Sequence, residues 1–357
     1  MDISVTMVRP GMARNKPTDE SKLGFGIYFS NHMFLLDYRT GADWHNPRIE
    51  PYRSFVLEPA AIVLHYGQEV FDGHKAYRMP DNKVALFRAH DNLRRMSRSA
   101  ERLCIPAYPE DLVYDGMKRL IQIDKDWVPS APQTSLYVRP TIIATEPFLG
   151  VRPADEYLLY IITGPVGAYY PEGFSPVKIL VEDTYVRASP GGVGEAKTSA
   201  NYAASLKAQV EAHAKGYTQV LWLDAREQRY VEEVGTMNIC FKFKDELVTP
   251  PLTGTILPGI TRDSILTMCR DMGLNVNERQ VSIDEVIDKA RSGELEEVFG
   301  AGTAAVISPV ACLGYKGEDI TIADGQAGKL SQELFKRLTD LQYGLADDPY
   351  GWLEVVT

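Results

Sequence analysis

One lysine, Lys197, lies between a glycine-rich stretch and a run of small residues in GGVGEAKTSANYAASLKAQ (191–209). An amine can condense with an aldehyde to form an imine, but a pKa of about 10.4 keeps a solvated lysine protonated at neutral pH. A desolvated site beside other cations lowers that pKa by several units. The small neighbours would let a ring approach the backbone. The alternative is a solvated lysine at the start of a helix.

A carboxylate that could act with this amine follows in EEVGTMN (232–238), where Glu233 precedes a glycine and a strand. Held rigidly in this way, a carboxylate can keep a ring nitrogen protonated, and a protonated ring withdraws electrons from a carbanion. The alternative interpretation is a charged loop between two strands. Glu233 is therefore a candidate partner for an aromatic ring, and the charged loop remains the alternative.

Phosphate donors are offered by two loops and one arginine. LPGITRDSIL (257–266) puts Pro-Gly ahead of a helix whose first turn holds Ile260 and Thr261, and amides at a helix N-terminus bind phosphate. GAGTAAV (300–306) is a second small-residue loop, and Arg88 could donate two hydrogen bonds to a phosphate. Each feature alone is also explained as an ordinary cap, turn or surface residue. Together, amine, acid and phosphate donors form the set that pyridoxal phosphate requires.

These groups must be positioned by strands and helices that alternate irregularly, which favours an α+β fold over a regular βαβ series. The expected strands lie at 25–38, 83–88, 135–145, 156–163, 219–224, 237–243, near 298 and at 304–308. The expected helices lie at 91–103, 109–124, 261–272 and 329–343. The Pro- and Gly-rich PVGAYYPEGFSP predicts a domain junction. The predicted divisions are a flexible segment 1–24, a small domain 25–168, a linker 169–182 and a large domain 183–357.

Composition excludes several classes of function. With 38 basic and 48 acidic residues, the net charge of −10 argues against nucleic acid as a partner. The four cysteines are far apart, and the histidines form no H-x-x-x-H pattern, so neither a disulfide framework nor a metal site is expected. The N-terminus lacks an apolar signal core, and the longest apolar run is too short to span a bilayer. We expect a cytoplasmic protein without membrane contact.

The chain resembles branched-chain amino acid aminotransferases from about residue 24 to about residue 345. The motifs that carry the resemblance include FGIYFSNHM, LHYGQEVFDGHKAY, YVRPTII, GGVGEAKTSANYAASL, EVGTMNICF, TPPLTGTILPGITR and EVFGAGTAAV. The resemblance implies a fold-type IV pyridoxal phosphate enzyme, with a small α/β N-terminal domain, a larger mixed α+β C-terminal domain and the cofactor between them. It also implies a homodimer.

The resemblance further implies a role for each candidate cofactor residue. Lys197 would carry the Schiff base and relay the proton between the substrate α-carbon and the cofactor. Glu233 would pair with the pyridine nitrogen, Tyr202 would hydrogen-bond the phenolic oxygen, and Thr236 would lie near the ring. The phosphate would be held by Arg88, Ile260, Thr261 and Thr303.

For the substrate, the resemblance implies an aromatic pocket for branched side chains formed by Phe25, Tyr66, Phe71 and Tyr169. Arg139, with Tyr137 beside it, would accept the second carboxylate of glutamate. Backbone amides around Thr303 and Ala304 would bind the α-carboxylate. Without the resemblance, Phe25 and Phe71 are each better explained as core residues.

The implied reaction is a ping-pong transfer of the amino group from L-leucine, L-isoleucine or L-valine to 2-oxoglutarate, which gives a branched-chain 2-oxo acid and L-glutamate. Alternatives on the same fold are a D-amino acid aminotransferase and an aminodeoxychorismate lyase. A nicotinamide-dependent amino acid dehydrogenase and a catalytically silent binding protein are alternatives from other classes. The glycines of GGVGEAK lack the third glycine of a dinucleotide motif, which counts against the dehydrogenase.

Overall fold

The computed structural model describes residues 1–167 and 174–357 of the 357-residue chain. The described residues divide into two compact units. Unit 1 comprises residues 1–167, 196–199 and 340–357, and unit 2 comprises residues 174–195 and 200–339. Both units combine helices with a mixed sheet, so the predicted α+β class and its two-domain organisation are confirmed.

Unit 1 is built around one large sheet. Its strands are β1 (Ser4–Val5), β2 (His32–Arg39), β3 (Asp43–Pro51), β4 (Glu69–Phe71), β5 (His74–Arg78), β6 (Val84–Phe87), β7 (Ser135–Ala144), β8 (Glu156–Val166) and β18 (Leu353–Val355). Its helices are α1 (Ile62–Tyr66), α2 (Ala89–Arg102) and α3 (Glu110–Ile123), with 3-10 turns η1 (Glu20–Lys22) and η2 (Lys125–Trp127).

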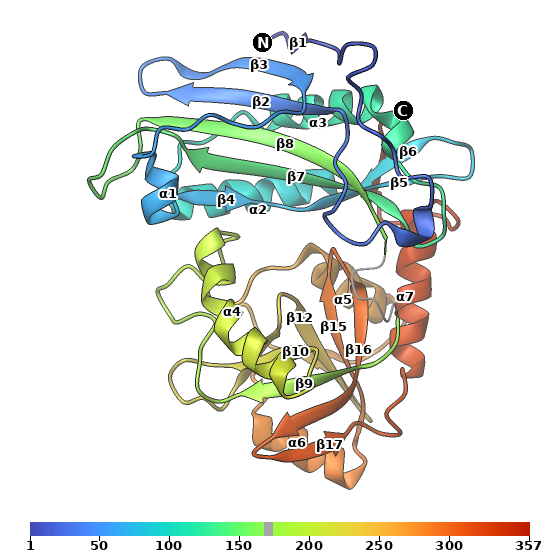
Figure 1. Ribbon diagram of the computed structural model, residues 1–357. Coiled ribbons are helices and arrows are strands. Elements are labelled where there is room, and N and C mark those ends of the chain that lie inside the picture. The colour runs from blue at the N-terminus through green and yellow to red at the C-terminus, as the bar shows by residue number, and fades with distance from the viewer. Residues whose placement is uncertain (168–173) are drawn as a thin grey trace. The chain divides into compact units, whose positions relative to one another are not determined.

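The strands of unit 1 follow the order β1-β3-β2-β8-β7-β5-β6-β18, with β4 paired to β7. Side chains alternate across the sheet, so Phe34, Ile142 and Leu159 enter the core on the face that α2 and α3 cover (Figure 1). On the other face, Phe71 lies opposite Thr141 in the strand pairing. Arg139, two residues from Thr141 on β7, points to that same face.

Unit 2 contains the second mixed sheet. Its strands are β9 (Val177–Glu182), β10 (Gln219–Leu223), β11 (Val231–Val234), β12 (Asn238–Phe243), β13 (Leu247–Thr249), β14 (Val276–Glu278), β15 (Leu295–Gly302), β16 (Val306–Tyr315) and β17 (Glu318–Thr321). Its helices are α5 (Ile260–Asp271) and α6 (Ile283–Ser292), most of α4 (Ser199–Ala214) and most of α7 (Lys329–Gln342). The strand order is β11-β10-β9-β16-β15-β12-β13-β14, with β17 paired to β16.

Two helices of unit 2 illustrate how local sequence sets the elements. Ser282 caps α6 by accepting the amide of Glu285, and Gly293 ends the helix with a left-handed φ of 75°. The small residues of α4 serve packing, because Ala208 and Ala212 are fully buried against Val220 and Trp222 of β10. A bulkier helix face would not fit this close approach.

The observed boundaries differ from the predicted ones at several places. The predicted strand 25–38 begins only at His32, because Gly24 and Gly26 take left-handed φ values of 59° and 73° just before it. Residues 177–182 of the predicted linker form β9, and 169–173 lie outside the described residues.

Three segments also belong elsewhere than predicted. Residues 340–357 join unit 1, since β18 pairs with β6, and residues 196–199 join it as well. The N-terminal residues 1–24, predicted to be flexible, are tied to unit 1, since β1 pairs with β3 and the Val8 amide donates to His32 Nε2 at 2.9 Å. In the described part of the chain, no helix combines the length and the apolarity that crossing a bilayer would need.

Candidate active site

Lys197 is fixed through its backbone within unit 1. Its N–H donates to Ser99 Oγ at 2.9 Å, and its carbonyl accepts the amide of Phe71 at 3.1 Å. The side-chain amine lies 5.2 Å from the centroid of the Phe71 ring, within range of a cation–π contact. The structure therefore places the predicted lysine directly against a predicted pocket wall.

Aromatic side chains and one cation gather beside Lys197. The Arg139 guanidinium lies 4.7 Å from the Phe71 ring centroid and donates to Tyr137 Oη at 2.9 Å. The Phe25 ring meets the Tyr137 ring edge-on, with centroids 4.9 Å apart. Four predicted substrate residues thus form one wall with the lysine, namely Phe25, Phe71, Tyr137 and Arg139. Such a wall offers hydrocarbon contacts together with a site for a carboxylate.

The other two predicted pocket residues are Tyr66 and Tyr169. Tyr66, at the end of α1, is exposed and donates its hydroxyl hydrogen bond to the carbonyl of Leu149. Its neighbour Gly67 lies next to Ser199, with a would-be Cβ 3.5 Å from the Ser199 hydroxyl. Tyr169 lies outside the described residues.

Arg88 stands at the start of α2 in an unusual conformation. It is the N-cap residue with a left-handed φ of 51°, and its amide donates to the Trp352 carbonyl at 2.8 Å. Its Nε donates to Asp91 Oδ2 at 2.7 Å, and its guanidinium lies 5.1 Å from the centroid of the Trp352 ring. A non-glycine residue in the left-handed region of backbone conformation must be held there by its surroundings, and the contacts with Trp352 and Asp91 hold Arg88.

Glu233 of β11 is a buried carboxylate, 3% exposed, in unit 2. Its Oε1 accepts the Leu257 amide at 2.7 Å, and its Oε2 lies 3.4 Å from Arg187 Nε. Arg187 also donates to the carbonyls of Gly194 and Thr255. The carboxylate is therefore held in one orientation by a cation and an amide, as the predicted ring partner requires.

The first turn of α5 lies beside the end of β15 in unit 2. The helix has no side-chain cap at Gly259, and Ile260 and Thr261 in its first turn are both buried. Asn238 joins the two elements, because it pairs with Ala301 in the sheet and donates to the Leu257 carbonyl at 3.0 Å.

Glycine at 259 is required by this packing, since a Cβ there would collide with Asn238 Oδ1. Beyond Ala301, β15 ends at Gly302, and the turn to β16 holds Thr303 and Ala304, both half-buried. Asn238 thus contacts both predicted phosphate loops of unit 2 and brings them close together, as a shared anion site would require.

Two remaining predicted residues have ordinary local environments. Tyr202 lies in the first turn of α4 and is half-buried. Thr236 is exposed in the turn between β11 and β12. The roles predicted for both residues stay predictions, since they depend on a bound cofactor.

The residues present fit pyridoxal phosphate in the kinds of group they provide. Lys197 supplies an amine, Glu233 supplies a rigid buried carboxylate, and the uncapped start of α5 supplies amides for a phosphate. Thr198, next to the lysine, is 1% exposed, and its hydroxyl has no hydrogen-bond partner among the described residues. A buried hydroxyl of this kind is usually satisfied by a bound group or by water.

Some residues in this region were missed by sequence reasoning. Asp72 and Arg95 form a fully buried ion pair at 2.6 Å between the end of β4 and α2. Burial alone would raise the pKa of Asp72, but the adjacent Arg95 guanidinium holds that pKa below its usual range. Arg187 beside Glu233 was also missed. Asp72 could have been singled out as a charged residue inside the aromatic stretch VFDGHKAY. No sequence feature pointed to Arg187.

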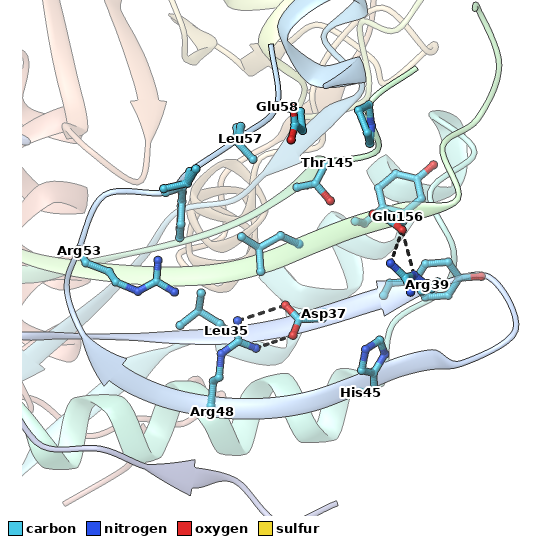
Figure 2. Close-up of a pocket in the computed structure, with 16 residues that line it drawn as sticks. Leu35, Asp37, Arg39, His45, Arg48, Arg53, Leu57, Glu58, Thr145 and Glu156 are labelled. Carbon is cyan, nitrogen blue, oxygen red and sulfur yellow. Dashed lines mark hydrogen bonds and ion pairs between the residues drawn. The ribbon is translucent and has the colours of Figure 1, made fainter. Parts of the chain in front are cut away.

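An open pocket of about 600 Å³ lies elsewhere on unit 1 (Figure 2). The pocket lies on the same face of the sheet as Phe71. Leu35, which lines the pocket, pairs with Tyr160, Tyr160 pairs with Thr141, and Thr141 pairs with Phe71. The arginines of its lining are matched by carboxylates: Arg39 by Glu156, Arg48 by Asp37, and Arg53 by Glu50. Its three arginines are all held in ion pairs, so the pocket does not alter the assignment of the site. Among the residues that the structure describes, no three or more His, Cys, Asp or Glu gather as a metal site would require.

We expect acid to destabilise the protein through His74 on β5, which is 1% exposed. Burial lowers the pKa of His74 to about 4, with Asp72 opposing and Arg95 adding to the effect. The unfolded chain, with a pKa of about 6.5, takes up the proton first, so about 3 kcal/mol of stability is lost as the pH falls from 6.5 to 4.

The thermal midpoint between pH 7.5 and pH 4 measures this loss. It should fall less steeply for His74→Leu than for the unmodified protein, while the same change at the exposed His65 should leave the slope unchanged. Equal slopes for the His74 variant and the unmodified protein would contradict the assignment.

Comparisons with known proteins bear on both units. The family model described as amino-transferase class IV matches residues 69–313. Branched-chain-amino-acid aminotransferase 2 of Bacillus subtilis (strain 168) is 52% identical over 334 residues, which cover 94% of this chain and 92% of that protein. The solved branched-chain amino acid aminotransferase of Escherichia coli is similar with a TM-score of 0.75 and 26% identity, covering 91% of this chain and 99% of that chain.

A solved branched-chain amino acid aminotransferase from T.th. with pyridoxamine 5'-phosphate is also similar, with a TM-score of 0.75 and 26% identity over 90% of this chain and 98% of that chain. The matched family segment spans most of the chain and contains the lysine, the buried carboxylate and both phosphate loops. The chain belongs to the class IV aminotransferase family.

Proposed function

We propose that the protein is a pyridoxal phosphate-dependent branched-chain amino acid aminotransferase. It transfers the amino group of L-leucine, L-isoleucine or L-valine to 2-oxoglutarate, and L-glutamate and the branched-chain 2-oxo acid leave. Membership of the class IV aminotransferase family and relatives that are about half identical over nearly the full chain support this activity. The similar T.th. structure with pyridoxamine 5'-phosphate supports the cofactor.

The arrangement around Phe71 carries the proposal. Its ring lies within cation–π distance of both the Lys197 amine and the Arg139 guanidinium. A hydrocarbon side chain can pack on this ring and on Phe25, while the carboxylate of a second substrate can reach the arginine. One pocket can therefore accept both an aliphatic and a dicarboxylic side chain, as the two half-reactions demand.

Each residue has a defined task in the proposed reaction. When bound, the cofactor supplies an electron-withdrawing ring that stabilises charge at the substrate α-carbon. Lys197 Nζ would relay the proton between the substrate α-carbon and the cofactor, in one direction in the first half-reaction and in the opposite direction in the second. Glu233, held by Arg187 and the Leu257 amide, would pair with the ring nitrogen.

The remaining assignments rest on the resemblance to the family. Arg88, Ile260, Thr261 and Thr303 bind the phosphate, Tyr202 binds the phenolic oxygen, and Thr236 lies near the ring. The amides at Thr303 and Ala304 bind the substrate α-carboxylate. By that resemblance, Tyr66 and Tyr169 would complete the aromatic pocket with Phe25 and Phe71, and Tyr137 orients Arg139 by their hydrogen bond of 2.9 Å.

Initial rates on three substrates test the activity. We expect rapid turnover of L-leucine with 2-oxoglutarate, and little or no turnover of D-alanine or aminodeoxychorismate. A D-amino acid aminotransferase would turn over D-alanine faster than L-leucine. A lyase would release product from aminodeoxychorismate without an oxo-acid acceptor. Either pattern would reject the proposal.

Arg139→Met should separate the two half-reactions. Removing the guanidinium leaves the second carboxylate of 2-oxoglutarate without its counter-charge, so the KM for 2-oxoglutarate should rise by ~10²-fold. The KM for leucine should change by less than ~3-fold, because methionine retains apolar contact with the Phe71 ring. Steady-state kinetics with each substrate varied in turn measures the difference.

Arg152→Met is a matched control, because Arg152 also lies over an aromatic ring of unit 1, 4.3 Å from the Phe148 centroid. It belongs to none of the assigned groups, and both KM values should remain near those of the unmodified protein. An equal loss of affinity for leucine and 2-oxoglutarate in Arg139→Met would contradict the role given to Arg139.

We also propose that the protein is a homodimer in the cytoplasm. Unit 1 exposes apolar side chains that a partner could cover, including Val56 at 95% and Val151 at 85% exposure, with Leu64 and Leu149. All four cysteines are free thiols, which suits a reducing compartment. The mass of the protein in solution tests the dimer.

A further inference from the structure

The backbone of Lys197 is anchored through Ser99, a residue of α2 that is 1% exposed. The Ser99 hydroxyl donates to the Arg95 carbonyl at 3.0 Å, so its proton is already committed. A lone pair of the same oxygen accepts the N–H of Lys197 at 2.9 Å. Because Ser99 is buried, replacing its hydroxyl would remove this acceptor from the lysine amide.

The helix that carries Ser99 is itself locked to β4. Arg95 binds Asp72 through two parallel hydrogen bonds, Nε to Oδ2 at 2.9 Å and Nη2 to Oδ1 at 2.6 Å. Asp72 is 0% exposed and Arg95 is 4% exposed. Asp72 directly follows Phe71, whose amide binds the Lys197 carbonyl at 3.1 Å. Sliding α2 along β4 would break a bidentate buried ion pair, which is strongly unfavourable.

The same network reaches the start of the helix. Asn92 donates through Nδ2 to the Arg88 carbonyl at 2.9 Å, and its Oδ1 accepts Arg95 Nη2 at 3.2 Å. Arg88, Arg95 and Ser99 are therefore tied into one rigid segment. That segment holds the backbone of Lys197 at one end and the proposed phosphate arginine at the other.

We infer that Ser99 is a positioning residue for the reactive lysine. It fixes the Lys197 backbone from the amide side, as Phe71 does from the carbonyl side, so that only the side chain moves while the amine reacts. This inference rests on the proposed function, because it takes the Lys197 amine to be the group that binds the cofactor and moves the proton. Ser99 itself touches neither substrate nor cofactor in this assignment.

The test compares Ser99→Ala with Ser99→Thr and with Ser97→Ala, each in the pyridoxal phosphate-loaded protein. Ser97 lies on the same helix, and its hydroxyl binds Glu110 instead of the lysine. Two assays are used: steady-state kinetics with leucine, which give kcat and KM, and the rate at which hydroxylamine strips the cofactor. The hydroxylamine rate reports how well Lys197 competes for the cofactor without any turnover.

We expect Ser99→Ala to lower kcat ~10-fold with little change in KM, and to speed cofactor loss ~10-fold. Ser97→Ala should match the unmodified protein in both readouts. Ser99→Thr should restore both, because a threonine hydroxyl can also donate to the carbonyl four residues earlier and accept an amide.

If Ser99→Ala matches Ser97→Ala in the hydroxylamine rate, the inference is overturned, even if the thermal midpoint falls, because the residue is then only structural. Failure of the unmodified protein to bind pyridoxal phosphate or to transaminate leucine is a different result. That outcome rejects the proposed function itself, so the two failures are distinguishable.

Discussion

Replacing Lys197 with alanine is expected to lower kcat with leucine by at least ~10⁴-fold, because the variant loses both the amine that binds the cofactor and the base that moves the α-proton. The two backbone hydrogen bonds to Ser99 and Phe71 do not involve the side chain, so the fold should survive. Single-turnover and steady-state assays measure the loss, and the thermal midpoint reports the fold.

Lys207→Ala provides the matched control. Lys207 is an exposed lysine on α4 whose amine pairs with Glu211 at 3.0 Å. An exposed pair of this kind contributes little to stability, so activity and thermal midpoint should remain close to those of the unmodified protein. Substantial leucine turnover by Lys197→Ala, with Lys207→Ala unaffected, would reject the assignment of the lysine.

Replacing Glu233 with glutamine should lower kcat by ~10²–10³-fold, the size of effect seen when one preorganised electrostatic group is lost from an active site. The amide can still accept the Leu257 N–H, but it carries no charge to keep a ring nitrogen protonated. It also leaves Arg187, 3.4 Å away, facing a neutral group. Measuring kcat and the absorption of the bound cofactor together separates lost electron withdrawal from lost cofactor.

The neighbouring Glu232→Gln is the sharper comparison, because both carboxylates are buried on the same strand. Glu232 accepts the Thr255 hydroxyl at 2.5 Å, and burial raises its pKa, with that hydrogen bond and Arg187 opposing. Successive strand residues point to opposite faces, so Glu232 cannot replace Glu233 beneath a ring. Equal losses in the two variants would mean that neither carboxylate has a specific role.

The sequence was most informative where a local pattern indicates a particular chemistry. Lys197 follows a glycine stretch, Ile260 and Thr261 open a helix after Pro-Gly, and Glu233 precedes a glycine turn, so each could be singled out without neighbours. The resemblance to a family then supplied Arg139 and the aromatic residues. Several long elements, among them α2, α3, α5, α7 and β7, were also predicted to within a few residues, because their periodicity extends over several turns or strand pairs, whereas β3 and α6 were missed.

What could not be predicted depends on contacts between distant parts of the chain. Ser99 meets Lys197 across 98 positions, and Asp72 meets Arg95 across 23, so no spacing rule links either pair. The short strands β13, β14 and β17 are too brief to show a period. The assignment of residues 196–199 to unit 1 is likewise a property of the folded chain, since its neighbours in sequence belong to unit 2.

The absorption spectrum of the purified protein loaded with pyridoxal phosphate tests the central claim most directly. Adding L-leucine alone should convert the spectrum to that of the aminated cofactor, and adding 2-oxoglutarate afterwards should restore it. Lys197→Ala should show no such cycle, and D-alanine should not start it. A spectrum that stays unchanged with L-leucine, or a protein that retains no cofactor, would contradict the account.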